Sequence, residues 1–295
     1  MTTEHTPPPQ SESVTSKDGT KIGYLKYGDG SSGILLVQGT MGSVENFREL
    51  AENLADTFIV YAVERRGRGI SGPTGTEYGI GREVEDLEAV LNKTKAENVF
   101  GLSSGAIISL EAARRLSSIK KLAIFEPPLL TSATLPRKLL DRYRSEIHED
   151  KTAAALVTAM QAGQFGPPIM KYMPRWLLVA FVNKIMAAEE KAGSGNYISM
   201  RKMAPIIQND FQLVEEMCDK MSSFGGISSE MLLLSGTKSP AYLRTATDSL
   251  AKLLPHATRI DLPNLGHSAA WNFDKQRNPD GAPNIVAEKL RNFFV

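Results

Sequence analysis

The chain has 295 residues, of which 42% are hydrophobic, and its formal net charge at pH 7 is +1. This length and apolar content are typical of a globular protein with one large α/β domain and an insertion. Because basic and acidic residues are interspersed and nearly balanced, the sequence offers no electrostatic footprint for nucleic acid or an anionic membrane. We therefore expect a small molecule as the binding partner.

The first residues are polar and rich in proline. Residues 1–12 lack the apolar stretch of a secretory signal, so we expect a disordered leader there. The longest wholly apolar run, Trp176 to Val182, is far shorter than the ~20 residues that a membrane-spanning helix requires. Cys218 is the single cysteine, which excludes an internal disulfide and fits a reducing compartment. We expect a cytoplasmic protein without a membrane span.

The first predicted elements are the opening strands of a sheet. Residues 13–27 alternate polar and apolar side chains around an Asp18-Gly19 turn, which predicts two antiparallel strands. Residues 33–37 and 58–63 are continuous apolar runs, as expected of strands buried on both faces. A helix over residues 46–54 separates these runs, and its apolar face consists of Phe47, Leu50 and Leu54.

The next segment, residues 64–72, combines charged side chains with three glycines. Phosphate-binding loops share this composition, but neither the lysine pattern of a P-loop nor a G-x-G-x-x-G spacing is present. We therefore interpret the segment as an arginine-glycine turn that braces the sheet. A helix follows, with its apolar face at Val84, Leu87 and Leu91.

The strongest signal for chemistry is the sequence GLSSG at residues 101–105, which ends an apolar run and begins an apolar helical pattern. This is G-x-S-x-G between a strand and a helix, where a nucleophile sits on a sharp turn and small residues let strand and helix approach. Ser103 has a glycine two residues away on each side. Ser104 has Leu102 and Ala106 instead, so we predict that Ser103 is the nucleophile.

The pattern changes after the next strand. Residues 120–125 predict that strand, and Glu126-Pro127-Pro128 ends it because proline stops both strand and helix. Strands that alternate with helices at this spacing favour a mostly parallel, doubly wound sheet. Residues 129–226 then show only helical patterns, rich in methionine and alanine, which predicts an inserted lid. Most of its apolar residues should form the lid's own core, and some should face a pocket.

After the lid the chain returns to the alternation of strands and helices. The last strand leads into a glycine turn that contains His267. Pro283 marks the start of the closing helix, a position that proline favours. The predicted elements are a strand over residues 231–236, a helix over 242–254, a strand over 258–262 and a helix over 284–294.

Four segments together resemble the α/β-hydrolase superfamily, and the likeness extends from Val14 to Val295. They are, in chain order, Gln38-Gly39-Thr40, Arg66 to Ser71, Gly101 to Gly105 and Leu265-Gly266-His267. We therefore expect an α/β-hydrolase fold, a mostly parallel doubly wound sheet with an inserted helical lid. Its core should comprise residues 13–128 and 227–295, and the lid residues 129–226.

The resemblance implies that His267 is the general base, and the chemistry agrees, since a serine hydroxyl is a poor nucleophile until an imidazole takes its proton. The usual position of the acid, the loop of residues 236–240, contains no carboxylate. Glu126 ends the strand after the nucleophile helix, where certain haloalkane dehalogenases of the superfamily carry their acid. Because neighbouring strands are ~4.8 Å apart, Glu126 can approach an imidazole poised over Ser103. We predict a triad of Ser103, Glu126 and His267.

Other assignments of the acid stay open. Glu126 could instead be a loop carboxylate held by backbone amides, and a Ser-His pair without an acid is a further alternative. Asp248 and Asp261 are poorer candidates, because Asp248 lies within a predicted helix and Asp261 lies at a strand end six residues before His267.

The resemblance also implies an oxyanion hole made by the backbone amides of Ser104 and Thr40. Fixed amides stabilise the charge that develops when a serine attacks a carbonyl, and the loss of one such donor costs roughly 3 kcal/mol. Gln38 stands where a histidine is often found in the family.

These residues predict a cofactor-free serine hydrolase that cleaves an ester, lactone or related acyl bond of an apolar small molecule through an acyl-serine intermediate. No Cys/His cluster suggests a metal. Three alternatives stay open: carbon-carbon bond hydrolysis, lyase or acyltransferase chemistry on the same triad; a non-catalytic ligand-binding receptor; and an interaction module that works through the lid. The sequence indicates no oligomeric state.

Overall fold

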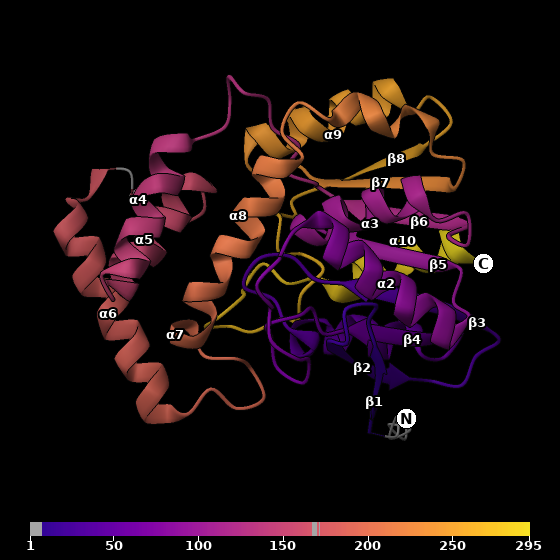
Figure 1. The fold of residues 1–295 in the computed structure, drawn as a ribbon, viewed down its shortest axis with the longest axis horizontal. Coiled ribbons are helices and arrows are strands. Elements are labelled where there is room, and N and C mark those ends of the chain that lie inside the picture. The colour runs from indigo at the N-terminus through magenta and orange to yellow at the C-terminus, as the bar shows by residue number, and fades with distance from the viewer. Residues whose placement is uncertain (1–7, 167–169, 171) are drawn as a thin grey trace.

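The computed structural model describes residues 8–166, 170 and 172–295. Its centre is an eight-stranded sheet in the order β1-β2-β4-β3-β5-β6-β7-β8, with helices on both faces (Figure 1). Strand β2 pairs antiparallel with both β1 and β4. All neighbouring strands from β4 to β8 in this order are parallel. This topology confirms the predicted mostly parallel, doubly wound sheet.

The strands lie close to their predicted positions, because a strand buried on both faces is a continuous apolar run in the sequence. The predicted bounds of β3, β4, β6, β7 and β8 are correct to within one residue. The strands are β1 (Gln10–Thr15), β2 (Lys21–Tyr27), β3 (Ser32–Val37), β4 (Phe58–Val63), β5 (Asn98–Leu102), β6 (Lys121–Phe125), β7 (Glu230–Gly236) and β8 (Thr258–Leu262).

The prediction of a disordered leader over residues 1–12 is wrong for its last three residues. Strand β1 begins at Gln10, so residues 10–12 belong to the sheet, where they pair with residues 24–26 of β2. An edge strand needs no apolar pattern, since its backbone hydrogen bonds and one cross-strand contact hold it. That contact is the Tyr24 hydroxyl, which donates to the Glu12 carboxylate at 2.9 Å. Residues 1–7 lie outside the described part of the chain.

Helices pack on the sheet through their apolar faces. The predicted apolar face of α2 is buried, and Pro283 stands in the first turn of α10. The helix predicted at residues 46–54 begins earlier, as a 3-10 turn that Ser43 and Asn46 cap. The core helices are 3-10 helix η1 (Val44–Phe47), α1 (Arg48–Leu54), α2 (Ile80–Thr94), α3 (Ser104–Arg115), α9 (Ala241–Leu253) and α10 (Pro283–Phe294).

Between β6 and β7 the described residues form helices and contain no strand. Helices α4 to α6 stand away from the sheet around an apolar core of their own, and α8 lies between them and the sheet (Figure 1). These helices are α4 (Arg137–His148), α5 (Thr152–Ala162), α6 (Arg175–Ala192), α7 (Met200–Met203), η3 (Ala204–Ile206), α8 (Ile207–Glu216) and η4 (Met221–Gly226).

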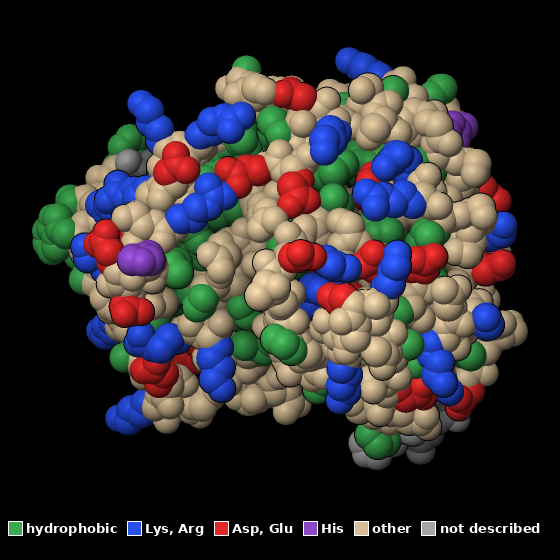
Figure 2. All heavy atoms as spheres, in the orientation of Figure 1, with side chains coloured by type: hydrophobic (Ala, Val, Ile, Leu, Met, Phe, Trp, Pro, Cys, Tyr) green, Lys and Arg blue, Asp and Glu red, His purple; other side chains and the backbone are tan. Residues whose placement is uncertain are grey.

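The surface mixes both signs of charge. On the face shown in Figure 2, Lys and Arg side chains are interspersed with Asp and Glu side chains. Within the described residues, no helix combines the length and the apolar composition needed to cross a membrane.

Candidate active site

Ser103 lies on a sharp turn between β5 and α3. Its φ of 57° and ψ of −122° put a non-glycine residue in a strained backbone conformation. The turn is held from the neighbouring strand, because the Ser103 amide donates to the Phe125 carbonyl at 2.9 Å. Glycine is required on either side: a Cβ on Gly101 would lie 2.6 Å from the Gly105 carbonyl oxygen, and one on Gly105 would lie 2.2 Å from that of Val37. The packing therefore requires glycine two residues before and two residues after Ser103.

This close packing makes a prediction for Gly105, the second residue of α3. Because the backbone of a central strand cannot move aside, Gly105→Ala should lower the free energy of unfolding by about 3 kcal/mol or more. Gly81 is the matched control, since it is the second residue of α2 and a Cβ there would meet nothing within 4 Å. Gly81→Ala should be neutral or stabilise by up to ~1 kcal/mol. Denaturant unfolding of both variants measures this, and equal stabilities would contradict the packing described here.

His267 and Glu126 are in direct contact. The Nδ1 atom of His267 lies 2.7 Å from Oε2 of Glu126, whose side chain is 0% exposed. The other carboxylate oxygen, Oε1, accepts hydrogen bonds from the Gly236 amide at 2.7 Å and the Ser235 hydroxyl at 2.8 Å. Burial opposes ionisation, but the hydrogen bond and charge of His267, with the Gly236 amide, outweigh it and hold the pKa of Glu126 below its ordinary value. The carboxylate is therefore ionised and binds the Nδ1 edge of the imidazole, which leaves Nε2 unoccupied by this contact.

The sheet places these residues at one edge. Ser103 follows β5 and Glu126 follows β6, which are neighbouring parallel strands, and His267 follows β8. The Ser103 amide donates to the carbonyl of Phe125, the residue just before Glu126, so a backbone hydrogen bond joins the Ser103 turn to the strand that ends at Glu126. Asp248 and Asp261 both pair with Arg259 instead.

The residues predicted for the oxyanion hole also border Ser103. A Cβ on Gly39 would lie 2.7 Å from that of Ser103, so the loop after β3 passes directly beside the Ser103 turn. The hydroxyls of Thr40 and Ser104 lie 3.5 Å apart. In the described part of the chain, neither the Thr40 amide nor the Ser104 amide donates to another backbone group. Ser104 is the first residue of α3, where amides are free and the helix dipole favours negative charge.

The arginines of residues 64–72 form buried ion pairs within the protein. Arg66 donates from Nε and Nη2 to both oxygens of Asp86, each at 2.7 Å, and from Nη1 to Asp18 at 2.8 Å. These contacts tie the turn after β4 to α2 and to the first hairpin, as expected of a bracing turn. Arg65 and Arg68 pair with Asp210 of α8, a residue that the sequence reasoning missed. Its one signal is a carboxylate three residues after Ile207, on the buried face of an amphipathic helix.

Glu64 lies buried against the loop that follows β3. Its Oε1 accepts hydrogen bonds from the Gln38 side chain at 3.0 Å and from the Val44 amide at 3.3 Å. Burial raises the pKa of Glu64 from 4.5 to about 7, although the charge of Arg68 acts in the opposite direction. The folded protein therefore binds a proton here at pH values where the unfolded chain does not.

This raised pKa sets the sign of a pH effect on stability. The protonated folded state is favoured between pH 4.5 and 7, so the stabilisation is lost as the pH rises through 7. From pH 6 to pH 8 the free energy of unfolding should fall by about 1 kcal/mol more in the wild type than in Glu64→Gln, which cannot ionise. Denaturant unfolding at both pH values measures the difference. Parallel pH profiles would contradict a pKa of about 7 for Glu64 in the folded protein.

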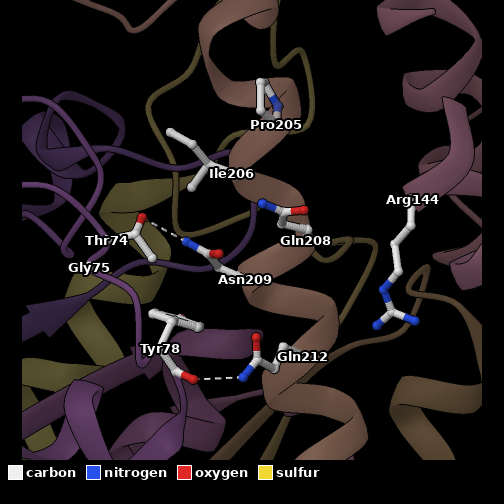
Figure 3. A pocket seen from close by; sticks show the side chains of 9 residues that line it. All are labelled: Thr74, Gly75, Tyr78, Arg144, Pro205, Ile206, Gln208, Asn209 and Gln212. Atoms are coloured by element: carbon white, nitrogen blue, oxygen red, sulfur yellow. Dashed lines mark hydrogen bonds between the residues drawn. The ribbon is translucent and has the colours of Figure 1, made fainter. Parts of the chain in front are cut away.

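A polar cleft of about 460 Å³ runs along the side of α8 (Figure 3). The Asn209 side chain donates to the Thr74 hydroxyl and the Gln212 side chain to the Tyr78 carbonyl, so polar contacts join α8 to the loop after β4. None of the predicted catalytic residues lines the cleft. Its lining is Thr74, Gly75, Tyr78, Arg144, Pro205, Ile206, Gln208, Asn209 and Gln212.

Comparisons with known proteins agree with the fold. A family model described as alpha/beta hydrolase fold matches residues 34–274. The crystal structure of an alpha/beta hydrolase from Sphaerobacter thermophilus superposes with a TM-score of 0.77 at 29% identity, over 96% of this chain and 100% of that one.

Two curated proteins match a shorter stretch. An uncharacterized hydrolase of Bacillus subtilis is 33% identical over 38% of this chain and 42% of its own length. An N-formylmaleamate deformylase of Pseudomonas putida is 29% identical over 39% of this chain and 44% of its own length. The match thus spans less than half of either relative. Because the family model covers most of the sequence and the sheet has the matching topology, the chain belongs to the α/β-hydrolase family.

Proposed function

We propose that this protein is a serine hydrolase that cleaves an ester, lactone or related acyl bond, with Ser103 as nucleophile, His267 as general base and Glu126 as the acid. The observation that carries the proposal is the 2.7 Å contact between His267 Nδ1 and the buried Glu126 carboxylate, at the sheet edge where the Ser103 turn lies. A buried carboxylate held in this way keeps an imidazole in one tautomer and one orientation. This is the arrangement that a weak serine nucleophile requires.

The reaction follows from these roles. His267 Nε2 takes the proton of the Ser103 hydroxyl as Oγ attacks the carbonyl carbon. The carbonyl oxygen becomes an oxyanion, which the amides of Ser104 and Thr40 stabilise. The intermediate collapses to an acyl-serine, and His267 gives its proton to the leaving alcohol. Water, deprotonated by His267, then attacks the acyl-serine, releases the carboxylic acid and restores the Ser103 hydroxyl.

Glu126 acts through His267 in both halves of the reaction. The imidazole becomes positively charged each time it takes a proton, and a carboxylate 2.7 Å from Nδ1 favours that charged form. Because its own pKa lies below the ordinary value, Glu126 stays ionised throughout and does not itself accept the proton.

The surroundings of His267 favour an apolar substrate. Phe165, from the segment assigned here to a lid of residues 129–226, stacks on the imidazole with ring centroids 5.4 Å apart. The Phe125 ring, which is 0% exposed, packs against the same imidazole in a T-shaped arrangement with ring centroids 6.4 Å apart, so the exposed aromatic surface at His267 is that of Phe165. Met41, next to Thr40, packs against the apolar core of the lid helices. An acyl group bound at Ser103 therefore meets aromatic and thioether surface, which binds hydrocarbon chains.

The name of the Pseudomonas relative also supports the reaction class, because a deformylase removes an acyl group. The test is hydrolysis of p-nitrophenyl esters whose acyl chains lengthen from acetate to decanoate. We expect turnover by the purified protein and a kcat/KM that rises with chain length over the first several carbons. A folded protein that hydrolyses no member of the series would contradict the proposed function.

A further inference from the structure

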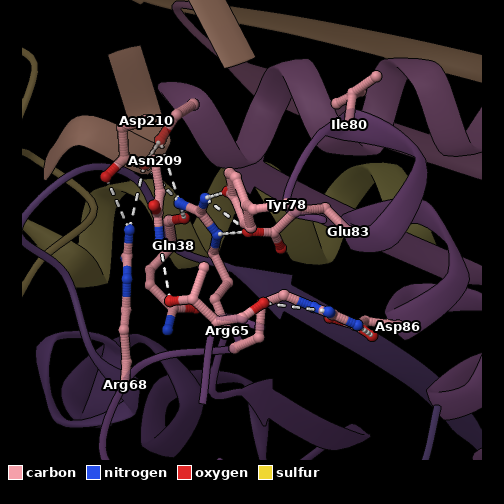
Figure 4. Close-up of polar contacts among 12 residues, drawn as sticks. Gln38, Arg65, Arg68, Tyr78, Ile80, Glu83, Asp86, Asn209 and Asp210 are labelled. Carbon is pink, nitrogen blue, oxygen red and sulfur yellow. Dashed lines mark hydrogen bonds and ion pairs between the residues drawn. The ribbon is translucent and has the colours of Figure 1, made fainter. Parts of the chain in front are cut away.

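Asp210 is a buried carboxylate of α8 that lies beside the oxyanion hole. Its side chain is 2% exposed, and it accepts hydrogen bonds from Arg65 Nη1 at 2.6 Å and Arg68 Nη2 at 2.8 Å (Figure 4). It also accepts a hydrogen bond from the Ser104 hydroxyl at 2.6 Å. Burial opposes ionisation, but the charges of Arg68 and Arg65 and these hydrogen bonds hold the pKa of Asp210 below its ordinary value. A charged group of the inserted helices is thus built into the wall of the proposed site.

Arg68 connects Asp210 to the loop after β3. While Nη2 holds the carboxylate, Nη1 donates to the carbonyl oxygens of Gly39 at 2.8 Å and Gly42 at 2.9 Å. The Gly39 carbonyl and the Thr40 amide belong to one peptide group. This group is trans, and peptide groups are planar. Any contact that fixes the direction of this C=O therefore fixes the direction of the Thr40 N-H as well. Arg68 orients one of the two proposed oxyanion donors.

Asp210 reaches the second donor through Ser104. The Ser104 hydroxyl donates to Asp210 and accepts from Arg65 Nη1 at 3.2 Å, which fixes the first residue of α3. Arg65 is itself anchored on Glu83, to which Nη2 donates at 2.8 Å (Figure 4). The same carboxylate therefore restrains the peptide groups of both Thr40 and Ser104.

We propose that Asp210 is a positioning residue that couples the docking of α8 to the geometry of the oxyanion hole. The proposal rests on the proposed function, in which that hole stabilises the tetrahedral oxyanion. When α8 is docked, Asp210 holds Arg68 and Ser104, and the two amides converge. When the carboxylate is removed, Arg68 loses its partner and the Gly39-Thr40 peptide group is free to tilt away.

The matched pair of variants is Asp210→Asn and Asp86→Asn. Both remove a carboxylate from a buried Arg-Asp pair, but the partner of Asp86 is Arg66, which holds the first hairpin and not the loop after β3. Burial raises the pKa of Asp86 to about 6, so assays at pH 8 compare two charged pairs. Both variants should unfold at lower denaturant concentration than the wild type. Only Asp210→Asn should lower kcat on a p-nitrophenyl ester, by about tenfold to 100-fold, with KM changed less than about threefold.

A second measurement distinguishes a change in the geometry of the oxyanion hole from a general loss of stability of the protein. The amides of an oxyanion hole are placed for oxygen, so a thionoester, whose carbonyl oxygen is replaced by sulfur, gains less from them. The ratio of kcat/KM for an ester over its thionoester should therefore fall at least about fivefold in Asp210→Asn and stay at the wild-type value in Asp86→Asn. Ser104→Ala keeps the backbone amide and removes one hydroxyl, so it should lower the same ratio by a smaller factor. This variant replaces Asp210→Asn in the test if Asp210→Asn does not fold.

The outcomes are distinct. Wild-type protein that hydrolyses neither compound overturns the proposed function. Active wild-type protein with equal kcat and equal ester-to-thionoester ratios in Asp210→Asn and Asp86→Asn overturns the coupling alone. If Asp210→Asn does not fold, a wild-type ratio in Ser104→Ala overturns it.

Discussion

The variant Glu126→Gln should have a kcat/KM about 10³-fold to 10⁴-fold below the wild type on the same p-nitrophenyl ester. An amide in this place carries no negative charge to favour the imidazolium, and its NH2 group can force the imidazole into the wrong tautomer. The side chain keeps its size, so the hydrogen bonds that Gly236 and Ser235 donate to Oε1 can persist. Steady-state kinetics at pH 8, with unfolding curves of both proteins, measures the effect.

Asp261→Asn is the control for this experiment. Asp261 is the second-last residue of β8, six residues before His267, but it is exposed and pairs with Arg259 at 2.9 Å. Its replacement should leave kcat/KM within about twofold of the wild type, since exposed ion pairs contribute little. Near wild-type kcat in Glu126→Gln, or a large loss in Asp261→Asn, would show that the acid has been assigned to the wrong carboxylate.

Ser103→Ala should show the largest loss of activity, about 10⁴-fold to 10⁶-fold in kcat. The nucleophile is gone, while the turn needs only a small side chain and no hydrogen bond of the Ser103 hydroxyl stabilises the described structure. Ester hydrolysis measured alongside thermal unfolding should therefore show an inactive protein of nearly unchanged stability.

The neighbouring serine provides the comparison. Ser104→Ala removes a hydroxyl of the same size one residue away, and its hydroxyl contacts Asp210 rather than the substrate. We expect a loss of about tenfold or less, because the Ser104 amide remains. If Ser104→Ala were the inactive variant and Ser103→Ala retained turnover, the nucleophile would be Ser104.

Much of the fold could be predicted because its signals are local. Strands β4 and β8 have the predicted bounds. Each is a short stretch of strand-forming residues, which ends at Glu64 after β4 and at Pro263 after β8. Residues 10–12 were missed because an edge strand with polar side chains resembles a disordered segment in sequence. The helix expected from residue 46 begins with a 3-10 turn at Val44 because the Ser43 cap precedes the first apolar position.

The candidate site likewise contains residues that the sequence could predict and residues that it could not. The Ser103 turn is a contiguous motif, and the position of Glu126 follows from the adjacency of β5 and β6, so both could be inferred from the chain. The contacts of Asp210 with Ser104 and Arg65 join residues more than 100 positions apart, and no local sequence pattern predicts which residue of α8 will contact them. Likewise the raised pKa of Glu64 depends on how completely the carboxyl group is buried, which is a property of the packed structure.

The most direct test of a serine made reactive by His267 is covalent labelling with a fluorophosphonate, followed by mass spectrometry of the peptide that contains residues 101–105. We predict one label per chain on Ser103 in the wild type and a labelling rate at least about 10³-fold lower in His267→Ala. Folded wild-type protein that takes up no label at Ser103, or His267→Ala protein labelled as fast as the wild type, would contradict the account.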